Sequence, residues 1–125
     1  INDTIDILDP YIINFGITFV IRAEDNADKY KALNNAVNIL KEHFSKTYFI
    51  GEPLYISDVY KKLKDAAGVL DVIKANVFSR AGGQYSGAQI DLDKNLSQDG
   101  SYLIVPKNAV LEMKFPEVDI IGKVR

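Results

Sequence analysis

The chain has 125 residues, of which 47% are hydrophobic and 26% charged, a composition typical of one globular domain with its own core. It contains no cysteine, which excludes disulfides, thiolate catalysis and cysteine-ligated zinc. The net charge of −2 lacks the basic excess of nucleic-acid-binding proteins, and no apolar run approaches the roughly 20 residues of a membrane helix. We therefore expect neither a nucleic acid nor a membrane as partner.

The first part of the chain contains its clearest strand signal. The sequence begins at Ile1 without a signal-peptide pattern, so we expect a segment of a longer polypeptide. Ile1–Pro10 alternates apolar residues with aspartates and is either a short edge strand or an incoming linker. In Tyr11–Ala23 every odd position is apolar, whereas the even positions are mostly small or polar. This alternation predicts one long strand that is covered on its odd face.

Two amphipathic helices are predicted to follow the strand. The residues 24–26 (Glu-Asp-Asn) provide capping side chains for the first helix. Ser57 or Asp58 caps the second, and Gly68 stands where a left-handed C-terminal cap belongs. The stripes that we expect to be buried are Tyr30, Leu33, Val37, Leu40 and Phe44 in the first helix and Ile56, Tyr60, Leu63 and Ala67 in the second.

The second half of the chain is predicted to contain three strands. Val69–Phe78 is rich in β-branched residues, as strands are. The glycine-rich and polar stretch Ser79–Gly100 predicts a mobile connection. Ser101–Val105 and Ala109–Phe115 then read as a hairpin around residues 106–108 (Pro-Lys-Asn).

These elements predict a single domain of residues 1–125 with an α+β fold. Its order is strand, helix, helix, strand, hairpin, and the economical arrangement is a mainly antiparallel sheet with both helices packed on one face. Pro116 cannot donate to a strand ladder, so we expect the chain to leave the sheet there. The apolar residues Val118, Ile120 and Ile121 of the tail are then candidates for partner binding, the alternative being that the tail folds back over the open sheet face.

A search for catalytic, metal-binding and cofactor-binding patterns finds none. His43 is the only histidine, so neither a catalytic triad nor a two-histidine zinc site has enough members, and we expect a surface or capping role. The acidic run Asp91–Asp99 has Leu96 and Tyr102 where a calcium loop needs glycine and glutamate. The glycine-rich residues 81–87 lack the lysine and hydroxyl residue of a phosphate-binding loop. We therefore expect no enzyme activity, metal or cofactor.

The run Tyr48–Phe78 carries a family resemblance. It reads YFIGEPLYISDVYKKLKDAAGVLDVIKANVF, in which an extended Ile-Gly segment leads into a short helix that ends at Ala-Gly-Val before a strand. Together with the preceding long strand and helix, this order resembles the C-terminal domain of baseplate J-like proteins, over residues 10–121. The ending KFPEVDIIGKV is most similar to the wedge subunits of T-even-type phages.

The resemblance implies a structural component of a contractile phage tail, located in the virion baseplate after assembly in the host cytoplasm. It implies self-association and contacts with other baseplate proteins, through which wedge subunits form a ring around the tail hub. Two hypotheses from other classes stay open: a regulatory domain that senses a small molecule, and an RNA-binding domain. RNA binding would require basic and aromatic residues on the free sheet face, where the first strand offers only Arg22 as a cation.

Overall fold

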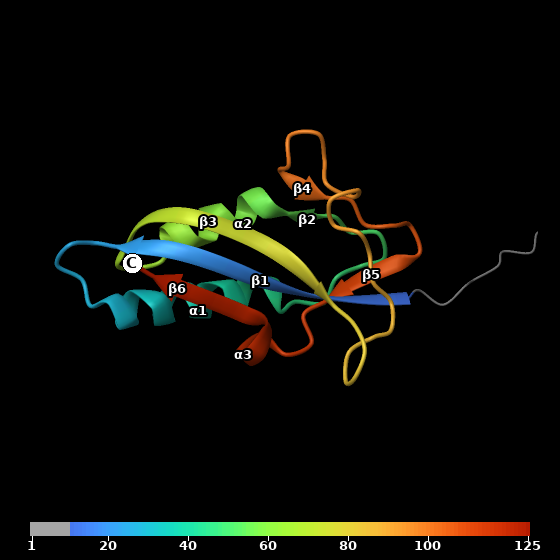
Figure 1. The fold of residues 1–125 in the computed structure, drawn as a ribbon, viewed down its shortest axis with the longest axis horizontal. Helices are drawn as coiled ribbons and strands as arrows, with labels where there is room; N and C mark the ends of the chain where they lie inside the picture. The colour runs from blue at the N-terminus through green and yellow to red at the C-terminus, as the bar shows by residue number, and fades with distance from the viewer. Residues whose placement is uncertain (1–10) are drawn as a thin grey trace, which may run out of the picture.

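The computed structural model describes residues 11–125, and their secondary structure is organised around one strand. Strand β1 (Tyr11–Ala23) is central in a four-stranded sheet (Figure 1). Strand β3 (Val69–Arg80) pairs antiparallel with one edge of β1. On the other edge, β5 (Ala109–Glu112) and β6 (Ile120–Val124) both pair parallel with β1. The prediction of an edge strand or linker at residues 1–10 falls outside the described part of the chain.

Helices α1 (Lys29–Phe44) and α2 (Ile56–Asp65) both lie on one face of this sheet, behind it in the view of Figure 1. A single helical turn, α3 (Pro116–Asp119), precedes β6. The predicted α+β class is confirmed, as is the order strand, helix, helix, strand for the first four long elements.

The predicted terminal hairpin is wrong. Its first strand contributes only β4 (Tyr102–Leu103), which pairs antiparallel with β2 (Leu54–Tyr55) in a separate two-stranded sheet. Its second strand contributes β5, which pairs with the beginning of β1 instead. The cause is the length of β1: β5 covers one edge of Tyr11–Asn14, and β6 covers the same edge further along. The sheet is therefore mixed, although its longest pairing is the antiparallel one between β1 and β3.

The odd face of β1 forms the centre of the core, as the alternation predicts. Its side chains at positions 13, 15, 17, 19 and 21 are at most 2% exposed. In helix α1 the predicted residues Leu33, Val37, Leu40 and Phe44 pack against or within the core, but the prediction is wrong for Tyr30, which is 77% exposed in the first turn. Asp28 caps this helix by accepting hydrogen bonds from two backbone N–H groups, so α1 begins later than residues 24–26 suggest. The fully buried residues of α1 are Ala32, Ala36, Leu40 and Phe44.

Helix α2 packs beside α1 and beneath β3. Val59 and Leu63 are the buried residues of α2. Leu63 belongs to the predicted stripe, but Val59 is buried where the prediction placed Tyr60. Neither Ser57 nor Asp58 caps the helix. Gly68 follows the helix with a positive φ of 88°, as predicted, and a side chain there would press against Ala32 of α1.

The predicted mobile stretch Ser79–Gly100 instead packs on the body of the domain. Strand β3 extends to Arg80, and apolar side chains beyond it are partly buried against the core. The backbone N–H of Ser86 donates to Asn14 Oδ1, and the Tyr85 hydroxyl donates to Asp119 Oδ1 over 2.8 Å. The apolar side chains that anchor the stretch are Ala88, Ile90, Leu92 and Leu96.

Candidate interaction surface

The three residues predicted to bind a partner do not share one environment. Ile120 is 6% exposed and belongs to the core, where it pairs with Ile17 across β1 and β6. Val118 on α3 is 57% exposed, and Ile121 is 44% exposed on the sheet face away from the helices. The tail leaves the sheet at Pro116, as predicted, but only for the turn of α3, and it then returns as a strand of the sheet. It neither projects freely nor folds over the open face.

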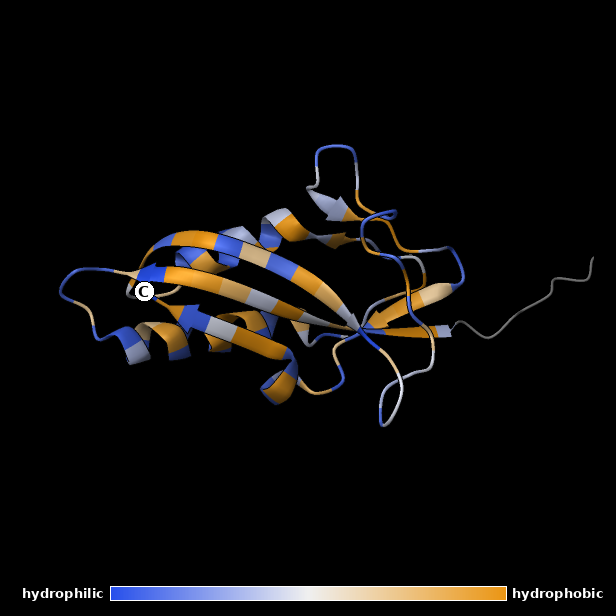
Figure 2. Ribbon diagram, in the orientation of Figure 1, coloured by the Kyte–Doolittle hydropathy of each residue, from blue (hydrophilic) through white to orange (hydrophobic). Residues whose placement is uncertain are grey.

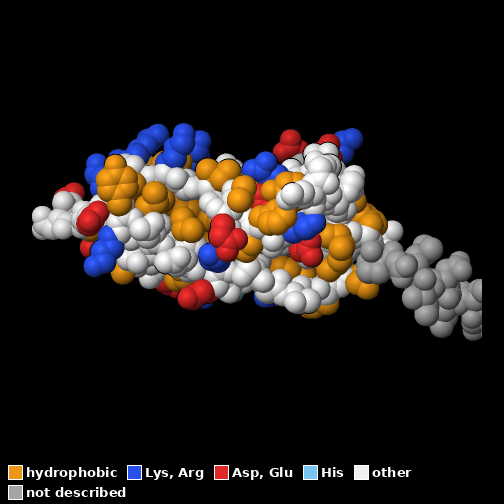
Figure 3. All heavy atoms as spheres, turned by 90° about the horizontal axis from the view of Figure 1, so that it is seen from below, with side chains coloured by type: hydrophobic (Ala, Val, Ile, Leu, Met, Phe, Trp, Pro, Cys, Tyr) orange, Lys and Arg blue, Asp and Glu red, His pale blue; other side chains and the backbone are white. Residues whose placement is uncertain are grey.

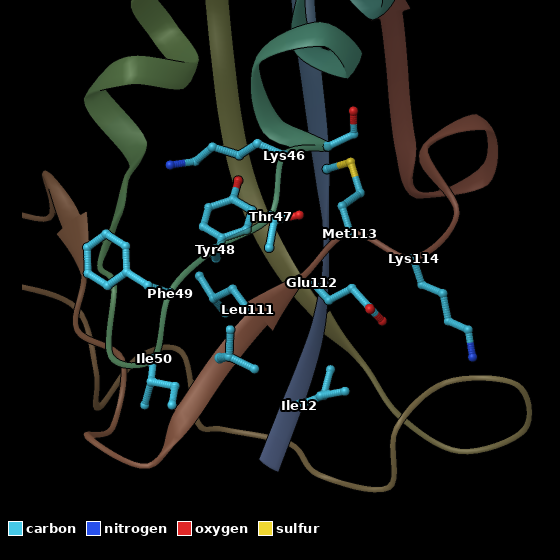
Figure 4. A pocket seen from close by; sticks show the side chains of 12 residues that line it. Ile12, Lys46, Thr47, Tyr48, Phe49, Ile50, Leu111, Glu112, Met113 and Lys114 are labelled. Atoms are coloured by element: carbon cyan, nitrogen blue, oxygen red, sulfur yellow. The ribbon is translucent and has the colours of Figure 1, made fainter. Parts of the chain in front are cut away.

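A larger apolar surface than that of Val118 and Ile121 lies beside β5, where β1 begins. A groove of about 850 Å³ separates the segment after α1 from β5 (Figure 4). Phe49 and Ile50 stand on one side of it and Ile12 on the other, with Tyr48 and Leu111 between them. Phe49 and Ile50 are both more than half exposed, and Ile12 is also exposed. Exposed apolar side chains that are gathered around a concave surface are typical of an interaction site.

A tight turn holds the rim of this groove in place. Glu52 accepts a hydrogen bond from the Phe49 backbone N–H, and its own N–H donates to the Phe49 carbonyl. Gly51, with a φ of 76°, donates its N–H to the carbonyl of Ala109 at the start of β5. Because these bonds close the turn, the backbone that carries Phe49 and Ile50 is already ordered before a partner binds, which lowers the entropy cost of binding.

The charged side chains at the groove already have partners within the domain. Lys46 forms an ion pair with Glu52, Lys114 donates to the Gln84 carbonyl, and Glu112 accepts from the Asn14 side chain. Burial opposes the ionisation of Glu52, but the hydrogen bonds from Lys46 and the Phe49 N–H outweigh it and lower its pKa. A ligand in this groove would therefore meet mainly apolar surface.

The sequence contained a signal for this groove that the prediction missed. Tyr48, Phe49 and Ile50 are consecutive, and an extended chain turns neighbouring side chains to opposite sides. Three large apolar neighbours therefore cannot all reach one core. Tyr48 is buried, donates its hydroxyl to the Phe44 carbonyl and has its pKa raised by burial and by Glu52, whereas the next two side chains point outward.

A buried polar cluster lies beneath the loop after β3. Asp119 is fully buried, and Arg80 Nε lies 3.1 Å from its Oδ1, next to the hydrogen bond from Tyr85. Arg80 also lies over the ring of Phe78, with its guanidinium carbon 5.0 Å from the ring centre. The Asp119–Arg80 contact is an ion pair without good hydrogen-bond geometry, since Arg80 Nε and Asp119 Oδ2 lack hydrogen-bond partners among the described residues. The cluster attaches the loop to α3.

The other residues that were considered for catalysis or metal binding make local structural contacts. His43 stacks edge-on against Phe44, and burial, followed by the nearby Lys62, lowers its pKa. The carboxylates of Asp91 and Asp99 accept hydrogen bonds from their own turns. Within residues 11–125 no group of three or more histidine or carboxylate side chains is arranged to hold a metal ion. In the same range no helix is long and apolar enough to span a membrane.

No family model matches the chain, and no curated protein matches its sequence. The resemblance to baseplate J-like proteins consequently depends on the run Tyr48–Phe78 and on the order of the elements around it.

Proposed function

We propose that this chain is a structural, non-enzymatic assembly domain of a baseplate wedge in a contractile phage tail. The observation that carries the proposal is the groove beside β5, whose rim side chains Phe49 and Ile50 are exposed and fixed by a closed turn. An apolar surface that is preformed and mostly without free polar groups suits a protein partner. The run Tyr48–Phe78, which resembles the wedge family, supplies the same rim.

In this function the domain binds copies of itself and other baseplate proteins in the ring around the tail hub. The exposed residues Val118 and Ile121 add a second apolar surface, on α3 and β6. Two separate surfaces are what a subunit needs in order to contact two neighbours in a closed ring. The domain then acts through its contacts, in the virion, after assembly in the host cytoplasm.

A sensing domain for a small molecule is the competing function, because the groove volume lies in the range of ligand pockets. Such pockets place a few polar groups so that they converge on the ligand. Here Lys46, Glu112 and Lys114 are each engaged within the domain. That engagement favours the protein partner.

The test is light scattering on the intact domain and on two double variants, Phe49→Asp/Ile50→Asp and Val118→Asp/Ile121→Asp. We expect the intact domain to self-associate and at least one variant to be a folded monomer. A monomeric intact domain at high concentration would contradict self-association. Genes for tail sheath, tube and a lysozyme-like protein beside the coding sequence would support the baseplate assignment, and metabolic genes in their place would overturn it.

A further inference from the structure

The sheet face away from the helices becomes strongly basic where β1, β3 and β6 run side by side. Val20 of β1 lies between Lys74 of β3 and Lys123 of β6. Arg125 N–H donates to the Ile21 carbonyl, and its own carbonyl accepts from Ala23 N–H, so Arg125 continues β6 opposite Arg22. Figure 2 shows hydrophilic residues at the neighbouring ends of β1 and β6. We call the four cations Arg22, Lys74, Lys123 and Arg125 the basic face.

The cations of the basic face have no ion-pair partners among residues 11–125. The three ion pairs there involve Lys41, Lys46 and Arg80 instead. Asp71 lies opposite Arg22 without an ion pair between them, so one carboxylate adjoins the four cations. Lys and Arg side chains gather at the upper left of the molecule in Figure 3. Adjacent strands are only about 4.8 Å apart, so these unpaired charges repel one another in the free domain.

An apolar patch lies next to these charges. Ile121, 44% exposed, lies opposite Thr18 of β1, and its neighbour on the same face of β6 is Lys123, which lies opposite Val20. Thr18, Val20 and Ile121 line a shallow depression of about 280 Å³, with Lys74 and Lys123 beside it. The surface therefore offers an apolar centre between cations, in a chain whose net charge is −2.

We propose that the basic face binds an acidic segment of a partner protein, with carboxylates on the four cations and an apolar side chain over Ile121. The basic face is locally positive, and the rest of the chain carries an excess of negative charge. A long polyanion would be repelled by that excess, whereas a short acidic segment would not. The basic face also presents no aromatic side chain for stacking nucleobases, since Phe78 of the same sheet face lies over Gly16. From the sequence alone only Arg22 could be placed on this sheet face. The other three cations come to lie beside it through the pairing of β1 with β3 and β6.

The experiment measures fluorescence anisotropy of a labelled peptide with alternating Glu and Ile residues, titrated with the intact chain at low salt. We expect saturable binding that Lys74→Glu/Lys123→Glu weakens by about tenfold or more, as interfacial charge pairs do. The matched control Lys61→Glu/Lys64→Glu makes the same charge change on exposed residues of α2 and should change the affinity by less than about twofold. Circular dichroism confirms that both variants are folded.

Three outcomes would overturn the inference. The first is no binding of the acidic peptide, and the second is equal weakening by the two charge-reversal variants. The third is tighter binding of a labelled oligothymidine or of anionic vesicles than of the peptide, which would assign the basic face to a nucleic acid or to a membrane surface. None of these results bears on the groove beside β5, so the proposed baseplate function is tested separately.

Discussion

Two glycines in the sheet each lie opposite a phenylalanine, and the ring takes the space that a side chain would need. Gly16 of β1 pairs with Phe78 of β3, and Gly122 of β6 pairs with Phe19 of β1. In both pairs, ring atoms of the phenylalanine stand where a Cβ on the glycine would lie. A glycine weakens a strand, and an aromatic neighbour across the ladder restores the missing contact. The two pairs lie on opposite faces of the sheet, so each face has its own aromatic cover.

Gly16→Ala should destabilise the domain by about 3 kcal/mol, as overpacking a filled core does. The new methyl group would meet the Phe78 ring and also lie 2.5 Å from the Asp119 carbonyl oxygen, and backbone cannot rotate away as a side chain can. Urea unfolding measures the loss. Gly87→Ala is the control, because nothing lies within 4 Å of its added Cβ, and it should be close to neutral. Equal stabilities of the two variants would show that the strands at Gly16 separate easily.

Asp99 should make stability depend on pH in the acid range. Hydrogen bonds from Ser101 and Ser97 lower its pKa from 3.8 to about 2. Because the folded state binds this proton less readily than the unfolded chain, the stabilisation is complete above the unfolded pKa and is lost as the pH falls towards 2. The Tm difference between the intact domain and Asp99→Asn should thus be largest near neutral pH and shrink below about pH 4. A difference that stays constant from pH 6 to pH 3 would contradict this origin.

At the scale of elements, one of the contacts that hold the loop after β3 is a hydrogen bond to a buried carboxylate. Tyr85→Phe removes the hydrogen bond to Asp119 and should cost about 2 kcal/mol, because hydrogen bonds to charged groups are worth more than neutral ones. Thermal unfolding measures the change. Tyr55→Phe serves as the control, since the same hydroxyl is removed from a side chain that is 47% exposed. A loss no larger than that of the control would show that this hydrogen bond does not help to anchor the loop, which then depends on its apolar side chains and on the Ser86–Asn14 hydrogen bond.

Strand β6 places two neighbouring isoleucines in opposite environments. Ile120→Asp buries a charge beside Ile17 and should prevent folding, whereas Ile121→Asp adds a carboxylate to the open face and should leave the fold intact. Circular dichroism of the two purified variants separates them. Two folded proteins would mean that β6 can slip by one residue, which exchanges the faces of the strand.

The periodicity of the sequence was sufficient for β1 but not for α1. In β1 the large side chains of the odd face from Ile13 to Ile21 are all buried, so the alternation indicates the core face, although Asn14, Gly16 and Val20 of the other face are buried too. In α1 the fully buried positions include Ala32 and Ala36, whose small side chains let the helix approach its neighbours, while the larger Tyr30 points to solvent. The predicted stripe was therefore wrong at Tyr30 and missed the two alanines, because close packing selects small residues at the contact, whereas Leu33, Val37, Leu40 and Phe44 do face the core.

At the scale of the whole molecule, the α+β class and the order of the first four long elements follow from the sequence, but strand β6 and the pairing of the strands do not. Local patterns show where β4 and β5 begin, yet nothing local shows that they pair with β2 and β1 instead of with each other. The groove beside β5 and the basic face could not be predicted from the sequence for the same reason. The groove requires the segment after α1 to lie beside β5, and the basic face requires three strands to align their cations.

The position of β6 on the central strand sets the order in which the domain is completed during translation. Strand β1 is synthesised among the first elements, but one edge of its second half, Ile17–Ile21, is covered only by Ile120–Val124. A ribosome must therefore translate as far as β6 before this edge is protected, and such a long sequence separation slows closure. Until then the nascent sheet presents an unpaired strand edge, where a chaperone or a neighbouring nascent chain competes with β6 for it. Hence a truncation before Ile120 would leave this edge of β1 unpaired instead of giving a slightly shorter domain.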